Sequence, residues 1–326
     1  MTTVVTGAAG FIGFHVAKAL LDRGETVLGV DNLNSYYDVR LKKARLARLT
    51  GHERFRFAAL DIADRAATLP LLSAARPTGI IHLAAQAGVR HSLVDPYAYV
   101  EANLMGQVVM LEAARSLSSP PHFVYASSSS VYGGNRKTPF STDDPVDRPV
   151  SLYAATKKAD ELITHSYSHL FRIPATGLRF FTVYGPWGRP DMAAFLFADA
   201  IMTGRAIRVF NHGDMRRDFT YIDDIVGGVL AALDRPPADE ADQAPHRVYN
   251  LGNNRAESLM RFIAVLEDAL GRPARKIFEP MQPGDMAETC ADISDSARDL
   301  GYAPRTTIED GLPRFAAWYK EYHEIQ

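Results

Sequence analysis

The stretch "TTVVTGAAGFIGFHV" (residues 2–16) decides the fold. A short run of β-branched residues precedes Gly7, Gly10 and Gly13, and an amphipathic run follows them. Glycine lets the backbone turn tightly there and approach an anion at the positive N-terminus of a helix. We therefore expect a β-strand, a glycine turn and a helix that together hold the pyrophosphate of a dinucleotide.

Apolar runs alternate with longer amphipathic runs through the first half of the chain. Further strands are predicted at residues 26–31, 55–61, 79–85, 122–130 and 175–185. Because these runs are apolar on both faces and are joined by helices, they indicate a parallel sheet covered on both sides. Right-handed crossovers then favour an α/β fold with a doubly wound parallel (Rossmann) sheet.

Two long helices complete this pattern. The helix before residue 122 is expected to place Val100, Leu104, Val108 and Leu111 on one face. The next helix is expected to begin near Ser151 and to lead back into the sheet.

Composition narrows the class of protein. The chain has 326 residues, 47% of them hydrophobic, with a formal net charge of −2, so nucleic acid and anionic membranes are not expected partners. Any anionic ligand must then be held by local cations. The single cysteine, Cys290, cannot form an intramolecular disulfide and fits a cytoplasmic location. The apolar N-terminus resembles a first strand more than a signal peptide, and no run approaches the roughly 20 residues of a membrane span.

Acidic residues at strand ends indicate which dinucleotide binds. Asp31 ends the second predicted strand, 18 residues after Gly13. A carboxylate there accepts hydrogen bonds from ribose hydroxyls and repels a 2′-phosphate, which favours NAD over NADP. Asp61 ends the third predicted strand and could meet the adenine side in the same way, although it could equally cap a helix.

Two polar motifs follow the later strands. "ASSSSVYGG" (126–134) places serines where an apolar strand ends, and "SLYAATKKADEL" (151–162) opens the next helix. Tyr153 and Lys157 are four residues apart, so both lie on one helical face. An ammonium group and a positively charged nicotinamide both stabilise a phenolate, which makes Tyr153 a candidate base.

In combination, these motifs resemble the extended short-chain dehydrogenase/reductase superfamily over essentially the whole chain. The resemblance implies a Ser/Thr–Tyr–Lys triad, in which "SSSSVYG" puts Ser128 beside Tyr153 and Lys157, with Ser129 and Ser130 nearer a sugar. Ser128 would polarise the oxygen from which Tyr153 takes a proton. The implied cofactor site also includes Phe11, Ile12, Asn32, Ile62, Leu83, Ala84, Ala85 and Asn103.

Ser129 and Ser130 also argue against some reactions of this superfamily. Nucleotide-sugar dehydratases carry an acidic pair before "VYG", and related decarboxylases carry a Glu. A serine is not a useful acid, so elimination is disfavoured. The reaction type that remains is oxidation of the sugar followed by its re-reduction.

The segment "LRFFTVYGPWGRPDMAAFLF" (178–197), with "DNLNSYYDVRLKKAR" (31–45) and "AAQAGVRHS" (84–92), resembles UDP-glucuronate 4-epimerases. In that family the matching arginine, here Arg189, faces the hexuronate carboxylate with Thr182 alongside, because a guanidinium pairs bidentately with a carboxylate. Arg90 is a second candidate for the same anionic region. The alternative for Arg189 is an arginine that ties down a Pro/Gly-rich loop.

Two later segments, "VFNHGDMRRDFTYIDDI" (209–225) and "MQPGDMAETCADISDSARDLGY" (281–302), resemble the nucleoside-diphosphate segments of UDP-sugar epimerases. They imply that Arg217 binds the diphosphate and that Asp285 accepts from a ribose hydroxyl. The expected division is an NAD-binding domain at 1–181 and a smaller mixed α/β lobe at 182–326 that mainly binds the UDP-sugar. A segment near 216–234 should return to the first domain, and 234–247 should be a surface connection.

The expected function is interconversion of UDP-glucuronate and UDP-galacturonate on bound NAD, by oxidation at C4, rotation of the 4-keto sugar and re-reduction. A homodimer is usual in the resembled family. The alternatives are a 4-epimerase for neutral UDP-sugars, a decarboxylase or dehydratase, and a non-catalytic NAD-binding scaffold. No metal is expected, because His165 and His169 lack a third ligand.

Overall fold

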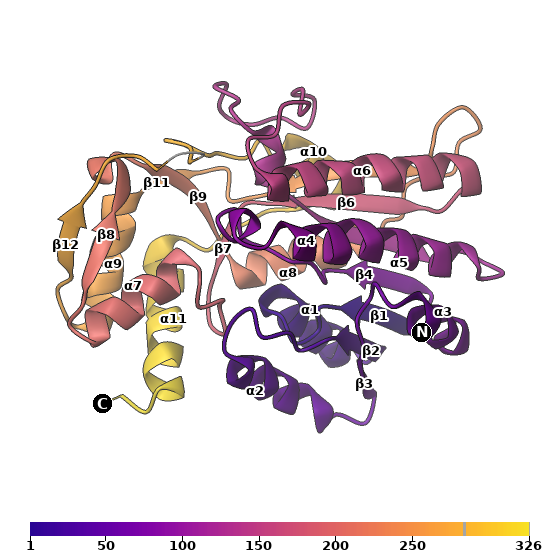
Figure 1. Cartoon of the computed structure of the whole chain (residues 1–326), viewed down its shortest axis with the longest axis horizontal. Coiled ribbons are helices and arrows are strands. Elements are labelled where there is room, and N and C mark those ends of the chain that lie inside the picture. The colour runs from indigo at the N-terminus through magenta and orange to yellow at the C-terminus, as the bar shows by residue number, and fades with distance from the viewer. Residues whose placement is uncertain (283–284, 326) are drawn as a thin grey trace.

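The computed structural model describes residues 1–282 and 285–325, and a large parallel sheet forms its centre (Figure 1). Among the described residues this sheet has seven strands in the order β10-β6-β5-β4-β1-β2-β3. All of its ladders are parallel. The strands are β1 (Thr2–Thr6), β2 (Thr26–Asp31), β3 (Phe55–Ala59), β4 (Gly79–His82), β5 (His122–Ser128), β6 (Ala175–Phe180) and β10 (His246–Leu251). The predicted α/β fold class is confirmed.

Helices cover both faces of the sheet, because alternate residues of each strand point to opposite sides. Val4 and Val5 of β1 are both fully buried, yet they belong to different hydrophobic clusters. The cluster of Val5 includes residues of α1 (Phe11–Asp22), α2 (Val39–Thr50) and α8 (Ile222–Leu233). The cluster of Val4 includes residues of α3 (Arg65–Ala75) and α5 (Gly106–Arg115), and α6 (Leu152–Phe171) packs on the same side.

The prediction of one regular helix before residue 122, with Val100, Leu104, Val108 and Leu111 on one face, is wrong. The chain forms α4 (Pro96–Tyr99), a π-helical turn η2 (Val100–Met105) and then α5. A π turn contains an extra residue, so positions before and after it do not share the face that a regular helix would give them. Val100 is accordingly exposed while Leu111 is buried. Tyr99 and Asn103 occupy the buried face instead.

A smaller lobe with mixed sheets stands beside the large sheet, on the left in Figure 1. Strands β7 (Thr182–Tyr184), β9 (Arg216–Tyr221) and β11 (Ala256–Ser258) form one sheet, in which β7 and β9 are parallel and β11 is antiparallel. Strands β8 (Ala206–Val209) and β12 (Arg275–Phe278) pair separately. The helices here are α7 (Ala193–Met202), α9 (Leu259–Leu270) and α11 (Ile308–Tyr322), whereas α10 (Ser294–Leu300) packs on β10 and α8 of the large-sheet part.

The chain returns from the lobe to the large sheet. Helix α8 follows β9 and packs on α1, and an exposed loop then leads into β10, which pairs with β6 at the edge of the sheet. No strand was predicted at β10. The boundary between 1–181 and 182–326 stays a prediction, and residues 283–284 and 326 of the predicted lobe lie outside the described residues. No described helix is both long and apolar enough for a membrane crossing.

Candidate functional site

A cavity of about 810 Å³ opens at the carboxyl ends of the central strands and is also lined by residues of the lobe. Ligands of open α/β sheets bind at this edge. Every predicted site residue except Asn103 lines the cavity. Residues nearly 280 positions apart in sequence, such as Gly7 and Asp285, therefore share one space.

The glycine turn connects β1 to α1 with no room for larger residues. Gly7 has a φ of +70°, and a Cβ there would lie 2.9 Å from the backbone nitrogen of Ala84. A Cβ on Gly13 would lie 2.0 Å from the carbonyl oxygen of Gly7. Helix α1 begins after Gly10 without a side-chain cap, so its first N–H groups remain available for an anion. This geometry fits a pyrophosphate.

Asp31 ties the glycine turn to the end of β2. Its two oxygens accept hydrogen bonds from the backbone nitrogens of Ala9 (3.1 Å) and Leu33 (2.8 Å). Each carboxylate oxygen can accept a further bond, so Asp31 can still bind ribose hydroxyls where it lines the cavity.

Asp61 lies near Asp31 in the cavity wall but does not cap a helix. It accepts hydrogen bonds from the side-chain amide of Asn32 (2.9 Å) and the backbone nitrogen of Ala63 (2.9 Å). The residue that caps α3 is Asp64. The alternative interpretation of Asp61 as a cap is therefore wrong.

Asn103 is the predicted residue that the structure does not bring to the cavity. Its buried amide donates to the carbonyl of Gln86 and to the hydroxyl of Thr156, and its oxygen accepts from the Gln86 nitrogen at 2.8 Å. Asn103 thus joins the loop after β4 to α6. It supports the wall of the cavity without lining it.

Helix α6 presents the predicted tyrosine and lysine. Ser151 caps the helix by accepting from the Ala154 nitrogen at 3.1 Å, so Tyr153 falls in the first turn. Lys157 follows one turn later and is buried, with its Nζ 3.0 Å from the Ala126 carbonyl and 2.9 Å from Asp160. Burial raises the pKa of Asp160 to about 6 despite the neighbouring ammonium. Both Tyr153 and Lys157 line the cavity.

The serine run divides between two environments. Ser127 points behind the site and donates to the buried Glu161 at 2.7 Å. Strand β5 ends at Ser128, which donates to the Ser130 hydroxyl at 3.1 Å and accepts from the Ser130 nitrogen at 3.2 Å. Ser129 and Ser130 belong to the 3₁₀ turn η3 (Ser129–Tyr132). All four residues border the cavity, but Ser127 turns its hydroxyl into the core.

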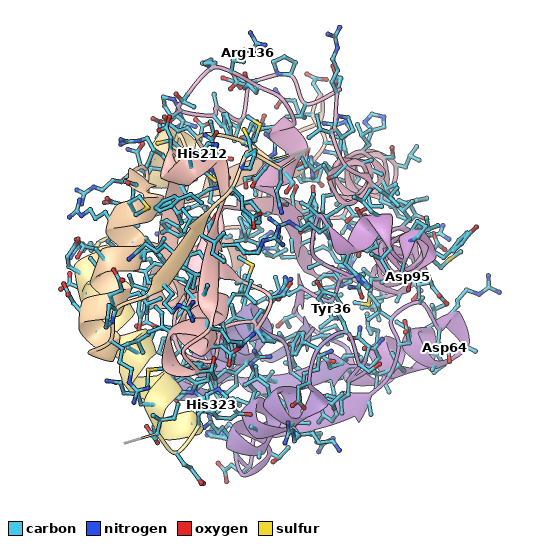
Figure 2. The ribbon with its side chains drawn as sticks, turned by 60° about the vertical axis from the view of Figure 1, so that its left-hand side comes forward. Tyr36, Asp64, Asp95, Arg136, His212 and His323 are labelled. Carbon is cyan, nitrogen blue, oxygen red and sulfur yellow. The ribbon has the colours of Figure 1, made fainter. Side chains whose placement is uncertain are left out.

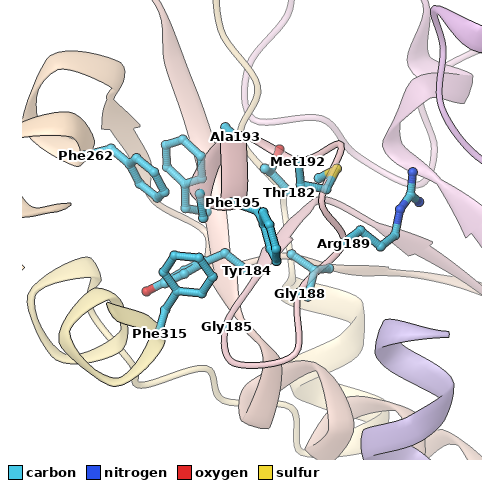
Figure 3. A pocket seen from close by; sticks show the side chains of 13 residues that line it. Thr182, Tyr184, Gly185, Gly188, Arg189, Met192, Ala193, Phe195, Phe262 and Phe315 are labelled. Atoms are coloured by element: carbon cyan, nitrogen blue, oxygen red, sulfur yellow. The ribbon is translucent and has the colours of Figure 1, made fainter. Parts of the chain in front are cut away.

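Arg189 extends from a loop that rests on aromatic side chains. Figure 3 shows it pointing away from Tyr184, Phe195 and Phe315, which lie to its left in this view and line a small pocket together with it. Its Nε donates to Asp191 at 3.0 Å, and Nη2 donates to the other Asp191 oxygen. Burial alone would lower the pKa of Arg189, but Asp191 outweighs it and raises that pKa.

Arg217 and Asp285, the residues predicted to bind the UDP moiety, form an ion pair. Arg217 donates to Asp285 at 2.8 Å and to the Ala287 carbonyl at 3.2 Å. Burial lowers the pKa of Arg217, although Asp285 opposes this effect. Arg90 instead lies over the ring of Phe210, 5.2 Å from its centroid, and both residues line the cavity.

Sequence reasoning missed several polar residues of the wall. These are Tyr36, Lys42, Asp191 and Arg208. Among the described residues, six Lys or Arg side chains line the cavity against four aspartates. The site is therefore cationic in a chain whose net charge is −2, which suits a ligand with several negative charges. The position of Asp191, two residues after Arg189, was an available signal.

The profile of the NAD dependent epimerase/dehydratase family matches residues 3–252. The chain belongs to this family. The family is NAD-dependent, which agrees with Asp31 at the end of β2.

Individual relatives and a solved structure are similar to the chain over nearly its full length. The chain is 47% identical to a probable UDP-glucuronate 4-epimerase of Rhizobium meliloti, over 98% of this chain and 97% of that protein. It is 48% identical to UDP-glucuronate 4-epimerase 3 of Arabidopsis thaliana, over 99% of this chain and 77% of that protein. The crystal structure of UDP-glucuronic acid 4-epimerase from Bacillus cereus, in complex with UDP-glucuronic acid and NAD, matches with a TM-score of 0.90. That match is 35% identical and covers 99% of this chain and 100% of the other.

Proposed function

We propose that this protein is an NAD-dependent UDP-glucuronate 4-epimerase, which interconverts UDP-glucuronate and UDP-galacturonate. The observation that carries the proposal is one cavity that combines the glycine turn, the Tyr153–Lys157 pair and Arg189. The identity of about 47% to a probable epimerase of this specificity, over nearly the full length, supports it.

Different residues of the cavity bind NAD and the UDP-sugar. The turn at Gly7, Gly10 and Gly13 and the N-terminus of α1 hold the pyrophosphate of NAD, and Asp31 holds its adenine ribose. Arg217 and Asp285 anchor the UDP moiety. Residues 1–181, with the returning α8 and β10, form the NAD-binding unit, and the rest of 182–326 mainly binds the UDP-sugar.

The remaining residues of the cofactor wall are apolar or contribute backbone groups. Phe11, Ile12, Ile62, Leu83, Ala84 and Ala85 line the same cavity as the glycine turn. A small-molecule site of this kind combines apolar walls with a few polar contacts that fix orientation.

The chemistry at C4 uses Tyr153, Lys157 and Ser128. Bound NAD⁺ supplies a reversible hydride acceptor. Tyr153 removes the proton of the 4-hydroxyl, and Ser128 donates a hydrogen bond to the same oxygen. Lys157 stabilises the phenolate of Tyr153 by its charge. Arg217 keeps the nucleotide bound while the 4-keto sugar turns, and Tyr153 returns the proton after re-reduction on the other face.

Arg189 and Thr182 give the site its preference for a hexuronate. A 4-keto uronate is a β-keto acid, which loses CO₂ readily only when the carboxylate bond lies parallel to the ketone π orbitals. Arg189 pairs with the carboxylate, and with Thr182 holds that bond out of alignment. Ser129 and Ser130 argue separately against dehydration, because neither serine can protonate a leaving hydroxyl.

Proton NMR tests the proposal directly. The purified protein, with no added coenzyme, is incubated with UDP-glucuronate, and the anomeric signal of a galacturonate is expected to appear. A parallel sample with UDP-glucose tests the neutral-sugar epimerase. The proposal fails if protein that contains bound NAD produces no galacturonate signal.

A cytoplasmic homodimer is the remaining part of the proposal. The single cysteine suits a reducing compartment. Exposed apolar side chains on η1 (His91–Leu93), α4 and α6 support self-association, because these elements pack against one another. They include Leu93, Tyr97 and Leu162, and Val94 directly follows η1.

A further inference from the structure

Asp191 engages only one edge of the Arg189 guanidinium. The Nε and Nη2 atoms of Arg189 donate side-on to the two Asp191 oxygens. A guanidinium has five N–H groups, so three remain. Within residues 1–282 and 285–325, the geometric hydrogen bonds of the Arg189 guanidinium run from Nε and Nη2 to Asp191, and the Tyr36 hydroxyl lies close to the same guanidinium. The Nη1/Nη2 edge can therefore donate end-on to a second carboxylate.

Tyr36, on the loop between β2 and α2, hydrogen-bonds to Asp191, on the loop between β7 and α7. Its hydroxyl donates to Asp191 Oδ2 at 3.0 Å, across 155 positions of sequence. Its ring lies 4.7 Å from that of His91, and a Cβ on Gly88 would lie 2.7 Å from its oxygen. In Figure 2, Tyr36 lies between the purple ribbons of the first part of the chain and the pink and tan ribbons of the lobe. The loop of Tyr36 is the one that begins at Asp31.

The neighbouring charges keep Asp191 ionised and Tyr36 neutral at neutral pH. Burial alone would raise the pKa of Asp191, but Arg189 and Tyr36 lower it below its usual value. Burial and the Asp191 charge raise the pKa of Tyr36 to about 12. At neutral pH, Asp191 is therefore an anion that accepts from a cation and from a neutral hydroxyl. Arg189 and Asp191 are only 22% and 29% exposed, so water screens the pair weakly.

We infer that Asp191 is a positioning residue, which fixes the plane of Arg189 so that its free edge meets the carboxylate of a hexuronate. Tyr36 supports Asp191 and joins this contact to the loop that follows β2. The inference rests on the proposed function, because it needs a UDP-hexuronate as the ligand. A misplaced arginine would still carry its charge, but it would lose the two-point pairing that gives orientation.

Binding of two ligands to the NAD-containing protein separates this role from a general structural one. UDP-glucuronate carries the carboxylate, whereas UDP carries the same nucleotide without the hexuronate. In Asp191→Ala, the Kd of UDP-glucuronate is expected to rise about tenfold to a hundredfold, as for other losses of substrate positioning. The Kd of UDP and the NAD content should stay within twofold of wild type. Tyr36→Phe should shift the ratio of the two Kd values in the same direction by a smaller factor.

A matched control is available on the surface. Arg23 and Asp234 form another bidentate pair, with both N···O distances at 2.9 Å, away from the cavity lining. Their side chains are 39% and 47% exposed, and such pairs contribute little to stability. Asp234→Ala should leave both Kd values unchanged. This variant controls for the loss of an Arg–Asp pair as such.

One outcome would overturn the role of Asp191, and a different outcome would overturn the proposed function. If wild type produces galacturonate and Asp191→Ala binds UDP-glucuronate as tightly as wild type or more tightly, Asp191 competes with the substrate and the inference is wrong. If wild type produces no galacturonate, the proposed function fails. If Asp191→Ala does not fold, the ratio of the two Kd values in Tyr36→Phe decides, and an unchanged ratio overturns the inference.

Discussion

A single hydroxyl at Tyr153 is the centre of the proposed chemistry. Replacing it in Tyr153→Phe removes the proton acceptor but leaves the ring that packs at 6.1 Å from Tyr99. We expect turnover to fall by a factor of about 10² to 10⁴, the range for loss of general acid–base catalysis. Galacturonate formation by NMR and NAD released on denaturation measure the two effects. Turnover within tenfold of wild type, with NAD retained, would contradict the mechanism.

Gly13 shows how one missing side chain permits cofactor binding. In Gly13→Ala, the new methyl group would overlap the carbonyl oxygen of Gly7, so the turn must shift away from its anion-binding form. We expect the purified variant to contain little or no NAD, as measured by absorbance after denaturation. Gly51→Ala is the control, because nothing lies within 4 Å of its added Cβ and its φ is −77°. A Gly13→Ala protein with full NAD content would show that the turn does not hold the cofactor.

At the scale of elements, helix α2 joins two loops of the site through one buried cation. Arg45 is fully buried and donates to the carbonyls of Ala9, Trp187 and Gly188. These carbonyls belong to the glycine turn and to the loop of Arg189. Arg45→Met should leave them without a donor and lower the free energy of unfolding by about 3 kcal/mol, since each unsatisfied buried group costs about 1–3 kcal/mol.

Urea unfolding measures that loss. Arg40→Met, on the exposed face of the same helix, is the control and should unfold like wild type. Arg45→Met should also bind UDP-glucuronate more weakly, because the loop of Arg189 loses its anchor. Unfolding midpoints that coincide for the two variants would contradict the role of Arg45.

Strand β9 contains a buried carboxylate that forms no salt bridge within the described residues, and this makes stability depend on pH. Asp218 accepts from Thr220 and from the backbone nitrogens of Asn253 and Ala291. Burial raises its pKa from 3.8 to about 6, although these hydrogen bonds oppose the rise. A raised carboxylate pKa contributes stability that is complete below about pH 4 and is lost as pH rises through about 6. The loss is at most about 3 kcal/mol, from a shift of roughly two units.

The comparison of wild type with Asp218→Asn isolates this group, because all other titrations cancel in the difference. The difference in free energy of unfolding, wild type minus variant, should fall between pH 4.5 and pH 7. Urea titrations at four pH values measure it. A difference that is constant over this range would show that Asp218 does not titrate as described.

Local patterns predicted most elements but not their interruptions. The β1 turn, the cap at Ser151 and the alternation of strands and helices all depend on neighbouring residues, which the sequence displays directly. The π turn at Val100–Met105 depends on packing against α6, and β10 depends on the open edge of β6. Neither cause is visible within the segment itself.

At the scale of the whole molecule, the site arises where distant segments meet. Contiguous motifs indicated Tyr153, Lys157 and Arg189, and the structure brings these three residues to one cavity. The contact between Tyr36 and Asp191 spans 155 positions and depends on how the lobe sits beside the large sheet. Sequence reasoning had no means to place those two side chains together, and the same limit applies to Arg45 with Trp187.

The apolar surface near α6 bears on assembly. Leu93 and Tyr97 are each 82% exposed, and Leu162 on the adjacent helix is 57% exposed. Leu93 and Tyr97 lie on two elements that contact each other, and an exposed apolar patch of this kind marks an interaction surface that a two-fold axis lets pair with itself. Because α6 also carries Tyr153, a dimer formed here would hold the helix on which the proposed base lies.

We expect that charged residues at Leu93 and Tyr97 separate the subunits. Sedimentation velocity should show a dimer for wild type and a monomer for the double variant Leu93→Asp/Tyr97→Asp, because two aspartates per subunit would be buried against their copies. Ile277→Asp is the control, since Ile277 is 52% exposed on β12 in the lobe. The control should remain a dimer. A wild type that sediments as a monomer, or a double variant that stays dimeric, would place the interface elsewhere or remove it.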